Sequence, residues 1–136
     1  MKYAAVAAAA MLLVAQDRTT QDGVYTEAQA KRGEETYAKA CASCHAADLS
    51  GSGQAPALAD ADFNKEWNSQ PLSDLFDRIH TTMPADAPGT LKPAEVADLM
   101  AFLFARARMP SGDTDLPGDT AALKSITFAA PKPQDR

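Results

Sequence analysis

Cys41-Ala42-Ser43-Cys44-His45 is the stretch of this sequence that decides its fold. Near the end of a helix, two thiols three residues apart lie on the same side, where each can reach one vinyl group of a porphyrin. The imidazole that follows then falls under the ring and can ligate its iron. A Cys-x-x-Cys-His string is typical of covalent haem attachment for this reason. The spacing predicts one covalently bound haem c, held by Cys41 and Cys44 and ligated by His45.

The composition predicts one small domain whose core a cofactor would complete. The chain has 136 residues, of which 46% are hydrophobic, but only five are Phe, three Tyr and one Trp. Small cores are often completed by a metal, a disulfide or a cofactor, and a haem would supply a large apolar body. The net charge of −5 and the lack of a basic stripe argue against nucleic-acid binding.

The N-terminal residues 1–15 have the composition of an export signal. Lys2 gives a positive start, and an uncharged, Ala-rich run follows from Tyr3 to Ala15. This run is shorter than the roughly 20 residues that span a bilayer, but it suits a secretory signal peptide. We expect export, or membrane anchoring if the signal stays uncleaved, and a flexible N-terminus over residues 16–25.

Apolar periodicity predicts three main helices and no strand of useful length. The first is expected over about 27–42, because Thr26 and Gln29 have the spacing of a capping box. The second is expected over about 71–80, and the third starts at Pro93, which is favourable in a first turn. A short helical turn is expected to carry two aromatic residues between the first and second helices, Phe63 and Trp67.

A haem at His45 has a second axial position, for which we favour Met83. Met83 lies in a Pro-rich loop where no helical stripe accounts for it. Pro84 and Pro88 stiffen that loop, which can therefore present a thioether to the iron. The other candidates have plainer explanations as core packing, a helix boundary or a helix end: Met100, Met109 and His80.

Other uses of the two cysteines fit the sequence less well. A thiol–disulfide oxidoreductase needs a strand before the motif and a βαβ context, and neither is visible. A structural disulfide between Cys41 and Cys44 would close only a tiny loop. A zinc site needs four ligands at workable spacing, and the available set places two on consecutive residues: Cys41, Cys44, His45 and His80.

The sequence resembles the class I (monohaem) cytochromes c over about residues 26–108. The resemblance rests on the Cys41–His45 motif, on Met83-Pro84 and on the last helical stretch, Glu95-Val-Ala-Asp-Leu99-Met-Ala-Phe102-Leu103. In that family the first and last helices cross at a glycine and an aromatic residue, and the matching positions here are Gly33, Tyr37, Leu99 and Phe102. The family's loop proline, to which Pro56 is similar, holds the proximal histidine through a backbone carbonyl.

This resemblance implies a small all-α cytochrome c fold of three main helices around a covalently bound haem c. The cytochrome c domain would span 26–109, and 110–136 would form an extended C-terminal tail, lying on the domain or loose. His45 and Met83 would be the axial ligands of an iron that cycles between Fe²⁺ and Fe³⁺.

With both axial positions filled, no substrate reaches the metal, so we expect an electron carrier and not an enzyme. The stretch 82–91 is similar to bacterial cytochromes that work with periplasmic dehydrogenases and terminal oxidases. It therefore implies a periplasmic location and redox protein partners: a dehydrogenase as donor, and a terminal oxidase or another cytochrome as acceptor. A haem-based sensor or haem enzyme with a labile Met83 ligand is the alternative.

Overall fold

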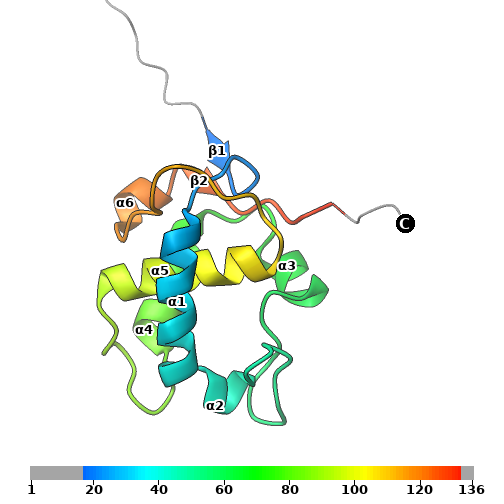
Figure 1. The fold of residues 1–136 in the computed structure, drawn as a ribbon, viewed down its shortest axis with the longest axis vertical. Coiled ribbons are helices and arrows are strands. Elements are labelled where there is room, and N and C mark those ends of the chain that lie inside the picture. Colours follow the sequence, from blue (N-terminus) through cyan, green and yellow to red (C-terminus); the bar gives the residue numbers. More distant parts are fainter. Residues whose placement is uncertain (1–16, 133–136) are drawn as a thin grey trace, which may run out of the picture.

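The computed structural model of the protein describes residues 17–132, so the expected signal segment 1–15 lies outside the described residues. Within 17–132 the chain forms six helices and two short strands (Figure 1). In chain order they are β1 (Arg18–Thr19), α1 (Glu27–Ala40), α2 (Ala42–His45), α3 (Ala61–Trp67), α4 (Leu72–Thr82), α5 (Pro93–Arg106), α6 (Thr120–Leu123) and β2 (Ile126–Thr127). The prediction of an all-α fold with three main helices is confirmed, because α1, α4 and α5 are the long elements.

The crossing of α1 over α5 is the central packing contact of the fold (Figure 1). At the crossing, a Cβ atom added to Gly33 would lie 1.8 Å from the carbonyl oxygen of Asp98. One turn further along, the rings of Tyr37 and Phe102 pack with their centroids 5.2 Å apart. The glycine therefore lets the two backbones touch, as the resemblance implied.

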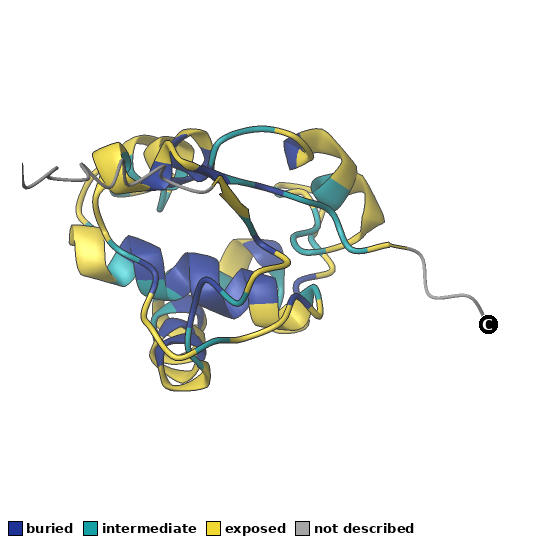
Figure 2. Cartoon of the chain, turned by 90° about the horizontal axis from the view of Figure 1, so that it is seen from above, coloured by how far each residue is buried: buried dark blue, intermediate teal, exposed yellow. Residues whose placement is uncertain are grey.

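Helix α5 lies in the middle of the molecule, with eight of its residues buried (Figure 2). The described core has two clusters. The larger joins α4 and α5 to the N-terminal segment and the tail. The smaller lies next to the Cys41–His45 motif and contains Tyr37, Leu49, Leu99, Phe102 and Leu103. This smaller cluster therefore borders the place where a haem attached to the motif would lie.

Residues 18–25, which belong to the segment expected to be a flexible N-terminus, make specific contacts with the tail and the core. β1 pairs in parallel with β2. The Thr20 hydroxyl donates to the carbonyl of Ala129 and accepts from its N–H, both at 2.9 Å, and Thr20 is fully buried. Val24 and Tyr25 are also buried in the larger core cluster. The segment is ordered because its apolar side chains and one hydroxyl find partners far along the chain.

The tail packs against the rest of the described chain and is not extended throughout. It includes the short helix α6, which packs against α4. Its apolar side chains enter the larger core cluster: Leu116, Leu123, Ile126 and Phe128. Phe128 packs edge-on against Phe104 at 5.9 Å between centroids.

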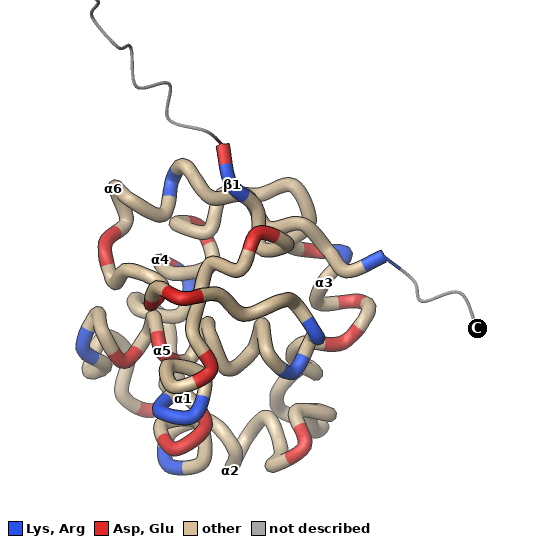
Figure 3. Tube along the Cα trace, turned by 45° about the horizontal axis from the view of Figure 1, so that its top comes forward, with Lys and Arg blue, Asp and Glu red and all other residues tan. Residues whose placement is uncertain are grey.

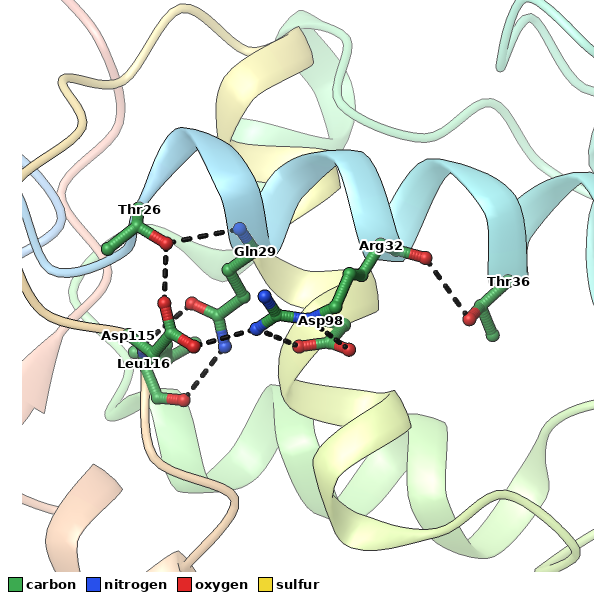
Figure 4. A network of polar contacts seen from close by, with 7 residues as sticks. All are labelled: Thr26, Gln29, Arg32, Thr36, Asp98, Asp115 and Leu116. Atoms are coloured by element: carbon green, nitrogen blue, oxygen red, sulfur yellow. Dashed lines mark hydrogen bonds and ion pairs between the residues drawn. The ribbon is translucent and has the colours of Figure 1, made fainter.

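Polar contacts tie the tail to α1 (Figure 4). The amide of Gln29 donates to the carbonyl of Leu116 at 2.9 Å and accepts from the N–H of the same residue at 2.7 Å. The Arg32 guanidinium lies between two carboxylates, 2.7 Å from Asp115 and 3.3 Å from Asp98. Arg32 therefore links α1 both to the tail and to α5.

Candidate haem site

The motif sits on one helical turn that follows α1 directly. Cys41 closes α1 through its N–H, which donates to the carbonyl of Tyr37 at 2.9 Å. The N–H groups of Cys44 and His45 then both donate to the carbonyl of Cys41, at 3.2 and 3.0 Å. Residues three apart on such a turn share a face. The two thiols therefore have the arrangement that attachment to two vinyl groups requires.

The environment of Cys41 does not suit thiolate chemistry. Burial, followed by the negative charge of Cys44, raises the pKa of the Cys41 thiol to about 11. Redox-active thiols have a lowered pKa, because the thiolate is the attacking species. The residues before the motif form α1 and not a strand. Both observations argue against the thiol–disulfide oxidoreductase alternative.

His45 is buried and held in one orientation by the loop that follows it. Its Nδ1 lies 2.8 Å from the carbonyl oxygen of Pro56. A carbonyl can only accept a hydrogen bond, so Nδ1 must carry the proton and donate. In the neutral imidazole Nε2 then carries no proton, and its lone pair is available to a metal. The Pro56 contact that the resemblance implied is present, and it selects the tautomer that can ligate iron.

The backbone around His45 is also held, because the carbonyls of residues 44–46 each accept a donor. The Ser52 hydroxyl donates to the first at 2.8 Å, the Gly51 N–H to the second at 2.9 Å and the Tyr37 hydroxyl to the third at 2.6 Å. Carbonyls at a helix end lack partners within the helix. The loop and α1 supply them here, so the turn that carries His45 is fixed on three sides.

Sequence reasoning did not identify Ser52 or Gly51 as contributors to this site. Gly51 has φ +82°, and an added Cβ would lie 2.6 Å from the Ala57 nitrogen. A glycine of this kind marks a tight turn, and that signal could have been read from the Gly-Ser-Gly string. The hydroxyl of Ser52 gives no such signal, because its partner is a backbone atom set by the fold.

Several apolar side chains beside the motif are only partly covered by protein. They pack against the smaller core cluster without being enclosed: Leu58, Ala59, Phe63, Ile79 and Leu91. A flat apolar group placed against them would remove this surface from water. Together with two thiols on one turn and a free Nε2 on His45, this wall fits a covalently bound haem.

Met83 follows α4 directly, and its N–H caps that helix by donating to the carbonyl of Ile79. It is half-buried, whereas Met100 and Met109 are enclosed in the larger core cluster. Core packing therefore accounts for both of those methionines. His80 is the last-turn residue of α4, with its ring 5.6 Å from that of Phe76. Met83 stays the predicted sixth ligand.

Within residues 17–132, no group of three or more His, Cys, Asp or Glu side chains is arranged to hold a metal ion. Two surface hollows, of about 330 and 500 Å³, border residues 57–61 and contain none of the predicted site residues. The candidate site is therefore located by the side chains of Cys41, Cys44 and His45 and not by these hollows.

A helical Cys-x-x-Cys-His turn, an oriented histidine and an apolar wall define a c-type cytochrome. The chain matches the family model of cytochrome c oxidase, cbb3-type, subunit III, over residues 28–103. It belongs to that family and is a class I monohaem cytochrome c with a covalently bound haem c. Comparison with curated protein sequences gave no match.

The fold is similar to one in the crystal structure of the sulfane dehydrogenase SoxCD from Paracoccus pantotrophus. The TM-score is 0.55 at 20% sequence identity, and the match covers 79% of this chain and 62% of that chain. The chain thus spans less than two thirds of that relative. At this identity the likeness shows the fold alone.

Proposed function

We propose that this protein is a single-haem electron carrier whose haem iron has His45 and Met83 as axial ligands. The observation that carries the proposal is the hydrogen bond from Nδ1 of His45 to Pro56, which leaves Nε2 free to ligate. Met83 also supports the proposal, since it is a half-buried thioether that core packing does not explain. If both axial positions are filled, no substrate can reach the iron, so the protein would carry electrons rather than act as an enzyme.

The protein's own residues would hold and shield the redox centre. When bound, haem c supplies a one-electron Fe³⁺/Fe²⁺ couple. Cys41 and Cys44 fix it covalently, and the Pro56 carbonyl keeps His45 in one tautomer. The apolar wall, which includes Phe63 and Ile79, keeps water away and so disfavours the extra charge of the ferric form.

The partners we propose are redox proteins of the periplasm: a dehydrogenase as donor and a terminal oxidase or another cytochrome as acceptor. The loops 46–57 and 83–91, which carry Pro56 and Met83, contain one charged residue each, Asp48 and Asp86. By contrast, α1 carries both acidic and basic residues along its length (Figure 3). The surface beside the haem therefore suits a largely uncharged docking face.

The proposed location rests on the composition of residues 1–15. None of the helices within 17–132 is long and apolar enough to cross a membrane.

Substitution of Met83 tests the axial ligation. We expect Met83→Ala to abolish the weak Met-to-iron absorbance band in the near infrared, because no other thioether takes its place. Met100→Leu is the matched control, since it removes a fully buried methionine sulfur at similar volume and should leave the band unchanged.

Carbon monoxide binding distinguishes a carrier from a sensor. The reduced wild-type protein should bind it poorly, and reduced Met83→Ala should bind it readily. Ready binding by the folded wild type would contradict firm Met83 ligation and would favour the sensor or haem enzyme alternative.

A further inference from the structure

Ser52 connects the turn that carries the haem-attachment residues to the turn that presents Pro56. Its hydroxyl donates to the carbonyl of Cys44 at 2.8 Å and accepts from the N–H of Gln54 at 3.2 Å. Its backbone pairs with Ala55 in both directions, at 2.8 and 3.3 Å. Ser52 thus joins the residue before His45 to the residue before Pro56.

This arrangement closes a ring of contacts around the proximal histidine. From Nδ1 of His45 the path runs through the Pro56 carbonyl, along the backbone to the pairing of Ala55 with Ser52, and from the Ser52 hydroxyl to Cys44. Cys44 is covalently joined to His45 in the chain. Every step outside the backbone is a hydrogen bond of ordinary length.

The Ser52 hydroxyl is the one side-chain hydrogen bond in this ring apart from that of His45. The Ser50 hydroxyl of the same loop is not part of the ring, because it donates to the nearby carboxylate of Asp48. Removal of the Ser52 hydroxyl would free the Cys44 carbonyl and remove the only side-chain link between the two turns in this ring, leaving the backbone bond from the Gly51 N–H to the His45 carbonyl. The distance between Nδ1 and the Pro56 carbonyl would then be held only by the backbone.

We propose that Ser52 is a positioning residue for the proximal haem ligand, acting through Cys44 and Pro56 on the hydrogen bond of His45 Nδ1. The proposal rests on His45 as a haem ligand, which the proposed function includes, but not on Met83. A hydrogen bond from a ligating imidazole to a carbonyl raises the basicity of the ligand. A more basic ligand favours Fe³⁺, so Ser52 would lower the reduction potential of the bound haem.

The test compares Ser52→Ala with Ser50→Ala in the holoprotein. Each variant removes one exposed serine hydroxyl from the same loop. NMR of the reduced protein follows the exchange of the His45 Nδ1 proton with solvent, and redox titration gives the potential. A lost hydrogen bond is worth about 1 kcal/mol, so Ser52→Ala should exchange this proton about fivefold faster and titrate at a higher potential. Ser50→Ala should match the wild type in both.

Ser52→Thr keeps the hydroxyl and should restore slow exchange and the wild-type potential. Equal exchange rates and potentials in Ser52→Ala and Ser50→Ala would overturn the proposal. Faster exchange that only follows a lower free energy of global unfolding, with the potential unchanged, would also overturn it, because a structural role explains that result. The near-infrared band of Met83 should persist in Ser52→Ala, so failure of this proposal is distinguishable from failure of the axial assignment.

Discussion

A single side chain, that of Tyr37, connects the helix crossing to the turn proposed to bind the haem. Its ring packs on Phe102, and its hydroxyl donates to the carbonyl of Ala46 at 2.6 Å. Ala46 has φ +69°, a conformation that residues other than glycine rarely adopt. Burial, and then the charge of Cys41, raises the pKa of the Tyr37 hydroxyl from 10.0 to about 12. The hydroxyl therefore remains a proton donor well above neutral pH.

Tyr37→Phe should lower the free energy of unfolding by about 1 kcal/mol, because it keeps the ring and removes one buried hydrogen bond. Tyr25→Phe is the matched control: its hydroxyl also donates to a backbone carbonyl at 2.6 Å, that of Met109, which lies outside the haem site. Denaturant unfolding should show a similar loss in both variants. Only Tyr37→Phe should also increase exchange of the His45 Nδ1 proton; equal exchange in the two would contradict the link between Tyr37 and the haem turn.

At this scale the sequence was sufficient for a contact that a matched family position supplied: Pro56 could be predicted because the resemblance named its partner, His45. The roles of Cys41, Cys44 and His45 toward the haem stay predictions from the spacing of the motif. Ser52 could not be predicted. A surface serine acquires a role only from the backbone carbonyl that folding places beside it.

The helices were predictable because their apolar periodicity is strong, and their ends were less so. α4 continues two residues past the expected end at His80, to Thr82. The hydroxyls of Thr81 and Thr82 each donate to a carbonyl four residues earlier. At the start of α5, the N–H of Lys92 donates to the Glu95 carboxylate at 2.8 Å. Such contacts between side chains and backbone accompany the helix ends and cannot be read from the apolar periodicity.

Gly33→Ala should disrupt the contact between α1 and α5. The added Cβ would lie 1.8 Å from the Asp98 oxygen, so one backbone must move, and we expect a loss of about 3 kcal/mol in the free energy of unfolding. The measurement is denaturant unfolding of the holoprotein, together with the yield of haem attachment.

Gly53→Ala provides the control for Gly33→Ala, because nothing lies within 4 Å of the Cβ it would add. It should be neutral or slightly stabilising. A Gly33→Ala protein as stable as Gly53→Ala would show that the helices do not cross as described.

Across the whole molecule, the least predictable feature is how the two ends of the described chain meet. β1 and β2 have two residues each and pair across more than 100 positions of sequence. No periodicity can be read from so short a strand. The docking of the tail also depends on contacts that the sequence does not reveal, such as the two hydrogen bonds between Gln29 and Leu116.

Asp115 should make the docking of the tail sensitive to acid. Hydrogen bonds from Thr26 and Arg32 hold the pKa of this carboxyl below its usual range. A lowered pKa in the folded state stabilises the protein above the unfolded value of about 3.9. That contribution is lost as the pH falls through the folded value. Because Arg32 and Asp115 are about half exposed, it amounts to only a few tenths of a kcal/mol.

Urea unfolding of wild type and Asp115→Asn should therefore show a small difference at pH 7 that is smaller at pH 3 and shrinks in high salt. Asp113→Asn, which removes the same charge from an exposed neighbour in the tail, should match the wild type at both values. A pH-independent difference would mean that the carboxylate charge is not what holds the tail to α1.

β1 and α2, the helix that carries the proposed haem-attachment residues, lie at opposite ends of the molecule (Figure 1). An electrode surface that captured the protein through a tag added ahead of residue 17 would therefore have α2 facing the solution. Electrons would have to cross the long dimension of the fold to reach the electrode, while soluble partners would meet the haem end unhindered. Attachment through a cysteine introduced in the loop 83–91 would reverse this orientation and bring the haem end to the electrode.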